Sequence, residues 1–216
     1  MKDLLRFNLN KYKFLFLDFE TTGLHLLRSQ PWDVSWHIHH GKNFVEKHQY
    51  FFKIPNLKIS EGAARVTGFN QNTLDEKGKD PKYIIDLLDS YLYNPEYTIV
   101  AANILNYDIF IHNAARLNFG YKTDYSYVQR IIDTNAISKS YFLQRKPPEE
   151  REDFLPFQFR MQNFKQKGLK SSNATMAKEF GIAVDETKLH GADYDVEITK
   201  QVFFNLVDKV DLIHYK

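Results

Sequence analysis

A short apolar run that ends in acidic residues constrains this chain more than any other feature. Residues 14–17 are Phe-Leu-Phe-Leu, and Asp18-Phe-Glu-Thr21 follows directly, before Thr22-Gly23. Such a run with a polar exit is typical of a buried strand that leaves its sheet at the carboxyl end. Side chains two apart on a strand face the same side. We therefore expect Asp18 and Glu20 to lie together where this strand opens to solvent.

Two carboxylates held this close repel each other unless a cation lies between them, and Mg²⁺ prefers oxygen ligands of this kind. The pair alone is weak evidence, because an Asp-x-Glu pair arises about once by chance in a chain of this composition. A second pair, Asp195-Val-Glu197, falls in an expected helix, where residues two apart do not face each other. Strand placement therefore singles out Asp18 and Glu20 as candidate metal ligands.

The rest of the pattern predicts a mixed sheet. A hairpin turn at His40-Gly41-Lys42 joins two expected strands, which together with the first form an antiparallel meander. Helices and strands then alternate, which favours parallel strands with helices on the sheet faces. Further strands are expected at 32–40, 44–54, 97–102 and 128–133, and helices at 80–94, 108–118, from 134, 173–180 and 194–210. The predicted fold class is α/β, with a mixed five-stranded sheet covered by helices on both faces.

Length and composition set outer limits. A chain of 216 residues predicts a single domain over 1–216, with an inserted loop region at about 139–170. The absence of cysteine excludes disulfides, thiolate metal sites and a cysteine nucleophile. The net charge of +2 argues against a uniformly basic coat. Residues 1–13 contain no apolar signal segment, so we expect a soluble, cytoplasmic protein without a membrane span.

Two more acidic positions lie at expected element boundaries. Asp108 begins a helix, where a carboxylate is also a normal cap. His190 and Asp195 are five apart at the start of the last helix, and Asp193 competes with Asp195 as a ligand. Each of these signals is weak alone. The alternative interpretation of His190 is an ordinary histidine in a surface loop. Their order along the chain makes them informative together.

That ordered set resembles the DEDD exonucleases of the DnaQ-like group, which have a ribonuclease H-like fold. Asp18-x-Glu20-Thr-Thr-Gly23 resembles the first motif of the family, and residues 99–108 resemble the second. His190-x4-Asp195 resembles the third motif in its histidine variant, known as DEDDh; the tyrosine variant would need a tyrosine at Gly191. One departure is that Asn103 lies five residues before Asp108, where the commonest form has four.

The resemblance implies a chemistry and a set of roles. Asp18, Glu20, Asp108 and Asp195 would hold two divalent ions, Mg²⁺ or Mn²⁺. His190 would take the proton of the attacking water, since imidazole titrates near neutral pH. The reaction would be hydrolysis of a 3′-terminal phosphodiester, which releases a nucleoside monophosphate. Residues implied to meet the 3′ end are Thr21, Thr22, Gly23, Leu24 and Asn103.

Two other groups of residues have competing interpretations. Residues 154–170 carry Lys170 and three further basic residues among phenylalanines, which fits either a single-strand groove or a solvated loop pinned by core phenylalanines. The basic residues are Arg160, Lys165, Lys167 and Lys170, and the aromatic ones are Phe157, Phe159 and Phe164. His37 and His39 share a strand face and could bind metal, but no third ligand is evident.

We therefore expect a metal-dependent 3′→5′ exonuclease that acts on the 3′ end of a nucleic acid, with single-stranded DNA favoured. The first alternative is an exoribonuclease of the same chemistry, because the motifs contact phosphate and the 3′ end. The second is a non-catalytic nucleic-acid-binding subunit of a polymerase, against which the intact carboxylate set argues, since idle carboxylates repel phosphate. A proofreading role would need a polymerase partner.

Overall fold

The computed structural model describes residues 9–26, 28–148, 150–210 and 212 of the chain. Residues 1–8 of the N-terminal segment, and Glu149 of the inserted region, therefore lie outside the described residues. No helix among the described residues is both long and apolar enough to cross a bilayer.

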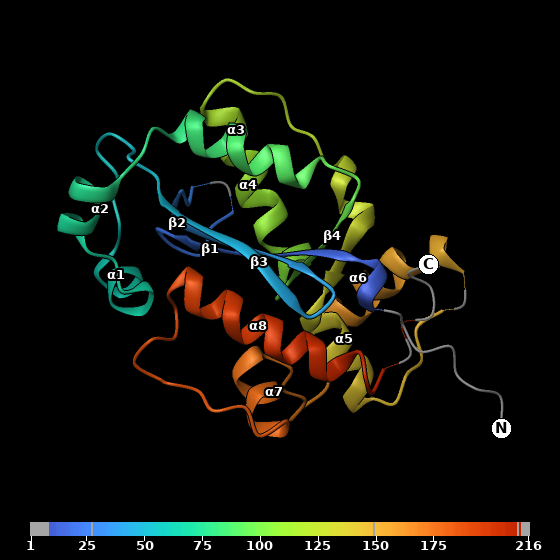
Figure 1. The fold of residues 1–216 in the computed structure, drawn as a ribbon. Helices are drawn as coiled ribbons and strands as arrows, with labels where there is room; N and C mark the ends of the chain where they lie inside the picture. Colours follow the sequence, from blue (N-terminus) through green and yellow to red (C-terminus); the bar gives the residue numbers. More distant parts are fainter. Residues whose placement is uncertain (1–8, 27, 149, 211, 213–216) are drawn as a thin grey trace, which may run out of the picture.

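A five-stranded mixed sheet forms the centre of the molecule (Figure 1). Its strand order is β3-β2-β1-β4-β5. The first three strands form the predicted antiparallel meander, and β4 and β5 add in parallel to β1. Their bounds are β1 Lys13–Thr21, β2 Pro31–His40, β3 Asn43–Phe51, β4 Tyr97–Ala101 and β5 Ile131–Asp133. The central position of β1 explains why its apolar run is continuous, since both of its faces are covered.

Helices cover both faces of the sheet, as predicted. In Figure 1, α3 and α4 lie on one side of the strands, and α7 and α8 lie on the other, while α1 and α2 lie at one end. The helices are α1 Glu61–Thr67, α2 Gln71–Lys77, α3 Pro81–Leu92, α4 Asp108–Asn118, α5 Thr134–Phe142, α6 Phe154–Asn163, α7 Asn173–Glu179 and α8 Ala192–Leu206.

Strand β1 divides the core into two layers. Leu15 and Leu17 belong to the cluster that also contains residues of α3 and α4. Phe14 and Phe16 point the other way, and Phe16 meets the Phe203 ring of α8 at a centroid distance of 5.6 Å. Because side chains alternate along a strand, the positions two and four beyond Phe16 also face α8. The fold thus directs the polar end of β1 towards the start of α8.

Several predicted bounds differ from the structure. Strand β5 begins at Ile131, because residues Ser126–Arg130 form a 3-10 helix. The last helix begins at Ala192 and ends at Leu206 rather than spanning 194–210. Helices α1 and α2 were not predicted.

The largest correction concerns the inserted region at 139–170, which we predicted to be a loop. Residues Phe154–Asn163 form helix α6. Phe154, Phe157 and Met161 are buried, and Phe157 and Met161 pack in a small cluster with Ala136 of α5. Their three- and four-residue spacing makes one apolar helix face, which tertiary packing stabilises.

Candidate active site

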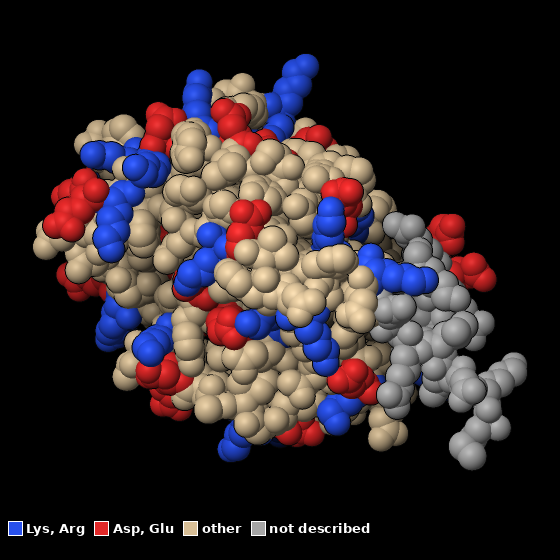
Figure 2. Space-filling view, in the orientation of Figure 1, with Lys and Arg blue, Asp and Glu red and all other residues tan. Residues whose placement is uncertain are grey.

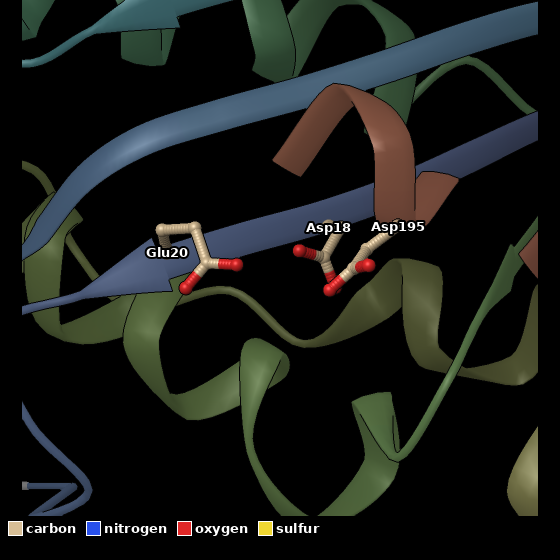
Figure 3. A group of neighbouring side chains, drawn as sticks. All are labelled: Asp18, Glu20 and Asp195. Atoms are coloured by element: carbon tan, nitrogen blue, oxygen red, sulfur yellow. The ribbon is translucent and has the colours of Figure 1, made fainter. Parts of the chain in front are cut away.

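Three carboxylates meet where β1 ends and α8 begins. Asp18 and Glu20 lie on β1, and Asp195 lies in the first turn of α8. One ligand oxygen from each falls within 4.8 Å of the others. Figure 3 shows the Asp18 and Asp195 carboxylates side by side, with that of Glu20 further along the same side of β1. Among the described residues, this is the one group of three or more His, Asp or Glu side chains with such spacing.

The fourth predicted ligand, Asp108, lies beside this group but is not part of it. It is buried at the first position of α4. The negative charge of Asp108 raises the pKa values of Asp18 and Glu20, so it lies close enough to interact with both. The Phe19 backbone, one residue beyond Asp18 on β1, lowers the pKa of Asp108, which places the Asp108 carboxyl next to β1. The structure therefore gathers three of the four predicted ligands and puts the fourth next to β1.

The electrostatics of the cluster favour a bound cation. Burial, reinforced by the neighbouring carboxylates, raises the pKa of Asp18 well above its usual range and that of Glu20 to about 9. Burial also raises the pKa of Asp108 to about 7, against the lowering effect of backbone hydrogen bonds. The pKa of Asp195 is raised by burial as well. A divalent cation would offset this repulsion, and a set of carboxylate oxygens fits the ligand preference of Mg²⁺ or Mn²⁺.

His190 lies in the turn just before α8, and its side chain is exposed. Its backbone N–H donates to Asp195 Oδ2 at 3.2 Å, and its φ of 64° is left-handed. A left-handed conformation is costly for a residue with a Cβ, and such strain is common at functional sites. The turn therefore couples His190 directly to one of the three clustered carboxylates.

The competing residues of the third motif have other partners. Asp193 accepts hydrogen bonds from His37 Nε2 at 2.7 Å and from Lys47 Nζ at 2.9 Å. These bonds lower the pKa of the Asp193 carboxyl. Glu197 pairs with Lys200 at 2.6 Å. Neither Asp193 nor Glu197 belongs to the three-carboxylate group, which agrees with our preference for Asp195.

Sequence reasoning missed one acidic neighbour, Asp33 of β2. It is the register partner of Glu20 and is only 2% exposed. Burial raises its pKa to about 7, although hydrogen bonds from Gln49 and the Ala192 backbone lower it. Asp33 thus lies close to the start of α8, a helix that has no side-chain N-cap hydrogen bond. The available signal was that Asp33 is the one acidic residue in the expected strand 32–40.

The residues predicted to meet a 3′ end form a turn after β1. Thr21 Oγ1 donates to the Gly23 carbonyl at 2.7 Å, and the Tyr107 hydroxyl donates to the same oxygen at 2.5 Å. Thr22 Oγ1 accepts the Gln30 amide at 3.0 Å. Leu24 is 89% exposed, so its side chain is available to a ligand.

Asn103 is exposed at the end of β4, with a left-handed φ of 60°. A 3-10 turn, Ile104–Asn106, separates it from α4. This turn takes up the extra residue that distinguishes the second motif from its commonest form. Asn103 and Asp108 thus both lie near the carboxyl ends of β1 and β4.

The basic and aromatic segment differs from the predicted stacking surface. Phe157 is 6% exposed and belongs to the core, so it cannot stack on a base. Phe164 is covered by the Arg145 guanidinium, 4.5 Å from its ring centre. Arg160, Lys165, Lys167 and Lys170 are exposed. On the face shown in Figure 2, basic and acidic side chains are interspersed.

The two strand histidines do not form a second metal site. His37 is bound to Asp193, as described above. Burial lowers the pKa of His39 to about 4, and its ring packs edge-on against Phe16. The single three-ligand group of the described residues includes neither histidine.

No protein-family model and no curated protein matches the sequence. Solved structures do match. E. coli exonuclease I in complex with a dT13 oligonucleotide superposes with a TM-score of 0.73 and 19% identity, over 92% of this chain and 41% of that chain. The described residues therefore share the fold of this structure, a mixed five-stranded α/β arrangement of the ribonuclease H-like type. The zinc-ion form of an E. coli exonuclease I–ssDNA complex gives a TM-score of 0.70 and 17% identity, over 92% of this chain and 40% of that chain. The chain thus spans about two fifths of the length of these structures.

Proposed function

We propose that this chain is a metal-dependent 3′→5′ exonuclease of the DEDDh type, which hydrolyses the 3′-terminal phosphodiester of single-stranded DNA and releases nucleoside monophosphates. The observation that carries the proposal is the group of Asp18, Glu20 and Asp195 within 4.8 Å at the junction of β1 and α8. The fold it shares with exonuclease I, whose structures include complexes with ssDNA, supports the same conclusion.

In this proposal, each group has one chemical task. The carboxylates of Asp18, Glu20, Asp195 and Asp108 would hold two divalent ions, Mg²⁺ or Mn²⁺, and such ions would supply a nucleophile at neutral pH and stabilise the leaving oxygen. His190 accepts the proton of the attacking water. The turn of Thr21, Thr22 and Gly23, with Leu24, Asn103 and Lys170, binds the terminal nucleotides.

We also propose that the protein lies in the cytoplasm and that it cooperates with a polymerase in proofreading. Binding to a purified polymerase would support proofreading, whereas activity without any partner would support a degradative role.

The test uses 5′-labelled single-stranded DNA and RNA of one sequence, with Mg²⁺ or Mn²⁺ and with a chelator control. The proposal predicts a ladder that shortens from the 3′ end and is lost with chelator and in Asp18→Ala. Faster cleavage of RNA than of DNA would instead support the exoribonuclease alternative. Binding without cleavage of either strand would contradict the proposal and support a non-catalytic subunit.

A further inference from the structure

A buried acid at the end of β5 organises the neighbourhood of Asn103. Asp133 is 0% exposed. Burial raises its pKa to about 6, against the lowering effect of backbone hydrogen bonds, so the carboxyl is ionised at neutral pH. An ionised carboxylate only accepts hydrogen bonds, so every polar neighbour must donate to it. Its donors are the backbone amides of Asn103, Leu105, Asn135 and Ala136, and the side-chain amide of Gln162.

This requirement fixes the orientation of Gln162. Gln162 lies on α6 and is 5% exposed. Its Nε2 donates to Asp133 Oδ2 at 2.9 Å and to Asn103 Oδ1 at 2.9 Å. The reversed amide would bring Oε1 against a carboxylate oxygen, and two acceptors repel each other. Both N–H groups of the Gln162 amide therefore point into the protein, one towards Asp133 and one towards Asn103.

The orientation of Gln162 in turn fixes that of Asn103. Because a donor faces it, the inward atom of the Asn103 amide is Oδ1. The Asn103 backbone N–H is held as well, at 3.1 Å from Asp133 Oδ1. None of the described residues accepts a hydrogen bond from the Asn103 NH₂ group. Since the residue is exposed, these two N–H donors are available to a ligand.

The sheet register places this donor at the edge that carries the carboxylates. Phe16 of β1 pairs with Val100 of β4 in parallel. Asp18 follows Phe16 by two residues, and Asn103 follows Val100 by three, so both leave the same edge of the sheet. At this position a neutral N–H donor can bind a phosphate oxygen of the nucleic acid without forming an ion pair with the neighbouring carboxylates.

We propose that Gln162 is a positioning residue, which holds the Asn103 amide with Oδ1 inward so that its NH₂ group donates to one non-bridging phosphate oxygen near the 3′ end of the bound strand. The inference rests on the proposed function. It gives α6 a role at the site, although α6 belongs to the inserted region and carries none of the motif residues.

The test replaces one phosphate acceptor at a time. Single-stranded oligonucleotides carry one methylphosphonate linkage at successive positions from the 3′ end, and binding is measured in an Asp18→Asn background to prevent cleavage. Adding Asn103→Ala should weaken binding of the unmodified strand about tenfold, the value of a hydrogen bond to a charged group. When the methylphosphonate stands at the linkage that Asn103 contacts, Asn103→Ala should weaken binding by less than about twofold. Asn103→Asp, which replaces the donor by a charged acceptor, should weaken binding by about 100-fold.

Gln162 is tested in the same assay. Gln162→Met should weaken binding, and adding it to Asn103→Ala should cause no further loss. Asn163→Ala is the matched control, because this exposed neighbour on α6 bonds only the Phe159 carbonyl among the described residues. Gln162→Lys keeps donors for both oxygens and covers the case in which Gln162→Met does not fold. It should retain binding within about twofold.

The outcomes separate this inference from the proposed function. Cleavage by the unaltered chain together with an equal Asn103→Ala loss on every modified strand would overturn the inference alone. A folded Gln162→Met with unchanged binding, or a folded Gln162→Lys with the full Asn103→Ala loss, would also overturn it. If the Asn103→Ala loss of binding depends on which linkage is modified, but the unaltered chain does not cleave, the inference is supported and the nuclease proposal is contradicted. No binding of any strand would overturn both.

Discussion

At the scale of single residues, the site is held in an unfavourable electrostatic state. Burial and mutual repulsion raise the pKa values of Asp18, Glu20, Asp108 and Asp195. A carboxyl whose pKa is raised by folding destabilises the folded state at every pH above its unfolded pKa. The destabilisation grows as pH rises and is complete above the folded pKa. The carboxylate group therefore lowers the stability of the metal-free chain, a cost that is common at active sites.

Asp108→Asn should stabilise the metal-free protein while reducing hydrolysis. The buried Asp108 carboxyl has a pKa of about 7, so its penalty is complete at pH 8 and smaller at pH 5. We expect Tm at pH 8 in chelator to rise by at least about 2–4 °C, the shift that 1 kcal/mol causes in a chain of this size. Asp208→Asn, with a side chain 67% exposed, is the control and should change Tm little. An unchanged or lower Tm for Asp108→Asn would contradict this account.

Tyr107→Phe should reduce activity without unfolding the chain. The hydroxyl that it removes joins the residue before Asp108 to the Gly23 carbonyl at 2.5 Å. Loss of one such hydrogen bond corresponds to roughly a three- to tenfold loss of kcat/KM if the turn binds the substrate. Steady-state kinetics measure it, with the exposed Tyr125→Phe as the control. Equal kinetics for Tyr107→Phe and Tyr125→Phe would show that the turn needs no such support.

At the scale of elements, some were predictable from sequence and others were not. Strand β1 was predictable because its apolar run lies at the centre of the sheet, and α3 because Asp80 caps it and Pro81 follows. Helices α1 and α2 span seven residues each, and only Leu74 among their residues is buried. Such short helices leave little periodic signal, although Ser60 and Asn70 do cap them.

Helix α6 escaped prediction because polar side chains complete its buried face. Gln158 and Gln162 are buried there beside the apolar residues. The Gln158 amide pairs with the open edge of β5: the Asp133 backbone N–H donates to Oε1 at 2.7 Å, and Nε2 donates to the Ile131 carbonyl at 2.9 Å. A glutamine that substitutes for a missing strand has no signature in a single sequence.

Gln158→Met should destabilise the chain by about 1–3 kcal/mol, because it removes both hydrogen bonds of the Gln158 amide and takes this acceptor away from the buried Asp133 backbone N–H. Urea unfolding measures the change. Gln166→Met, an exposed position in the loop after α6, is the matched control and should stay within about 0.5 kcal/mol of the unaltered chain. A similarly small effect at Gln158 would mean that α6 does not close the sheet edge.

At the scale of the whole molecule, residues far apart in sequence form the site. The pairing of β1 with β4 and the packing of α8 on the sheet bring the three motif segments together. The sequence predicted that Asp18, Glu20 and Asp195 approach one another, but not the contacts of Asp33 or Gln162. Those contacts depend on register and on a helix outside the motifs, and a single sequence does not encode either visibly.

Metal binding should stabilise the molecule more at high pH than at low pH. The cluster must lose its protons to bind a cation, and the pKa of Glu20 is about 9, so protons compete with metal below that value. We expect Tm in chelator to fall as pH rises from 5 to 8, and Mn²⁺ to raise Tm more at pH 8 than at pH 6. Asp195→Asn should lose most of this metal effect. A metal shift that is equal at both pH values would argue against binding at these carboxylates.

The most direct test of the central claim compares two acidic residues of α8, Asp195 and Glu197. Asp195 belongs to the carboxylate group, whereas Glu197, two residues later, pairs with Lys200 instead. Cleavage of a 5′-labelled single strand is followed in Mg²⁺ for the unaltered chain, Asp195→Asn and Glu197→Gln. The account predicts stepwise shortening from the 3′ end by the unaltered chain and Glu197→Gln, and a loss of at least about 100-fold for Asp195→Asn. Undiminished cleavage by Asp195→Asn, or none by the unaltered chain, would contradict it.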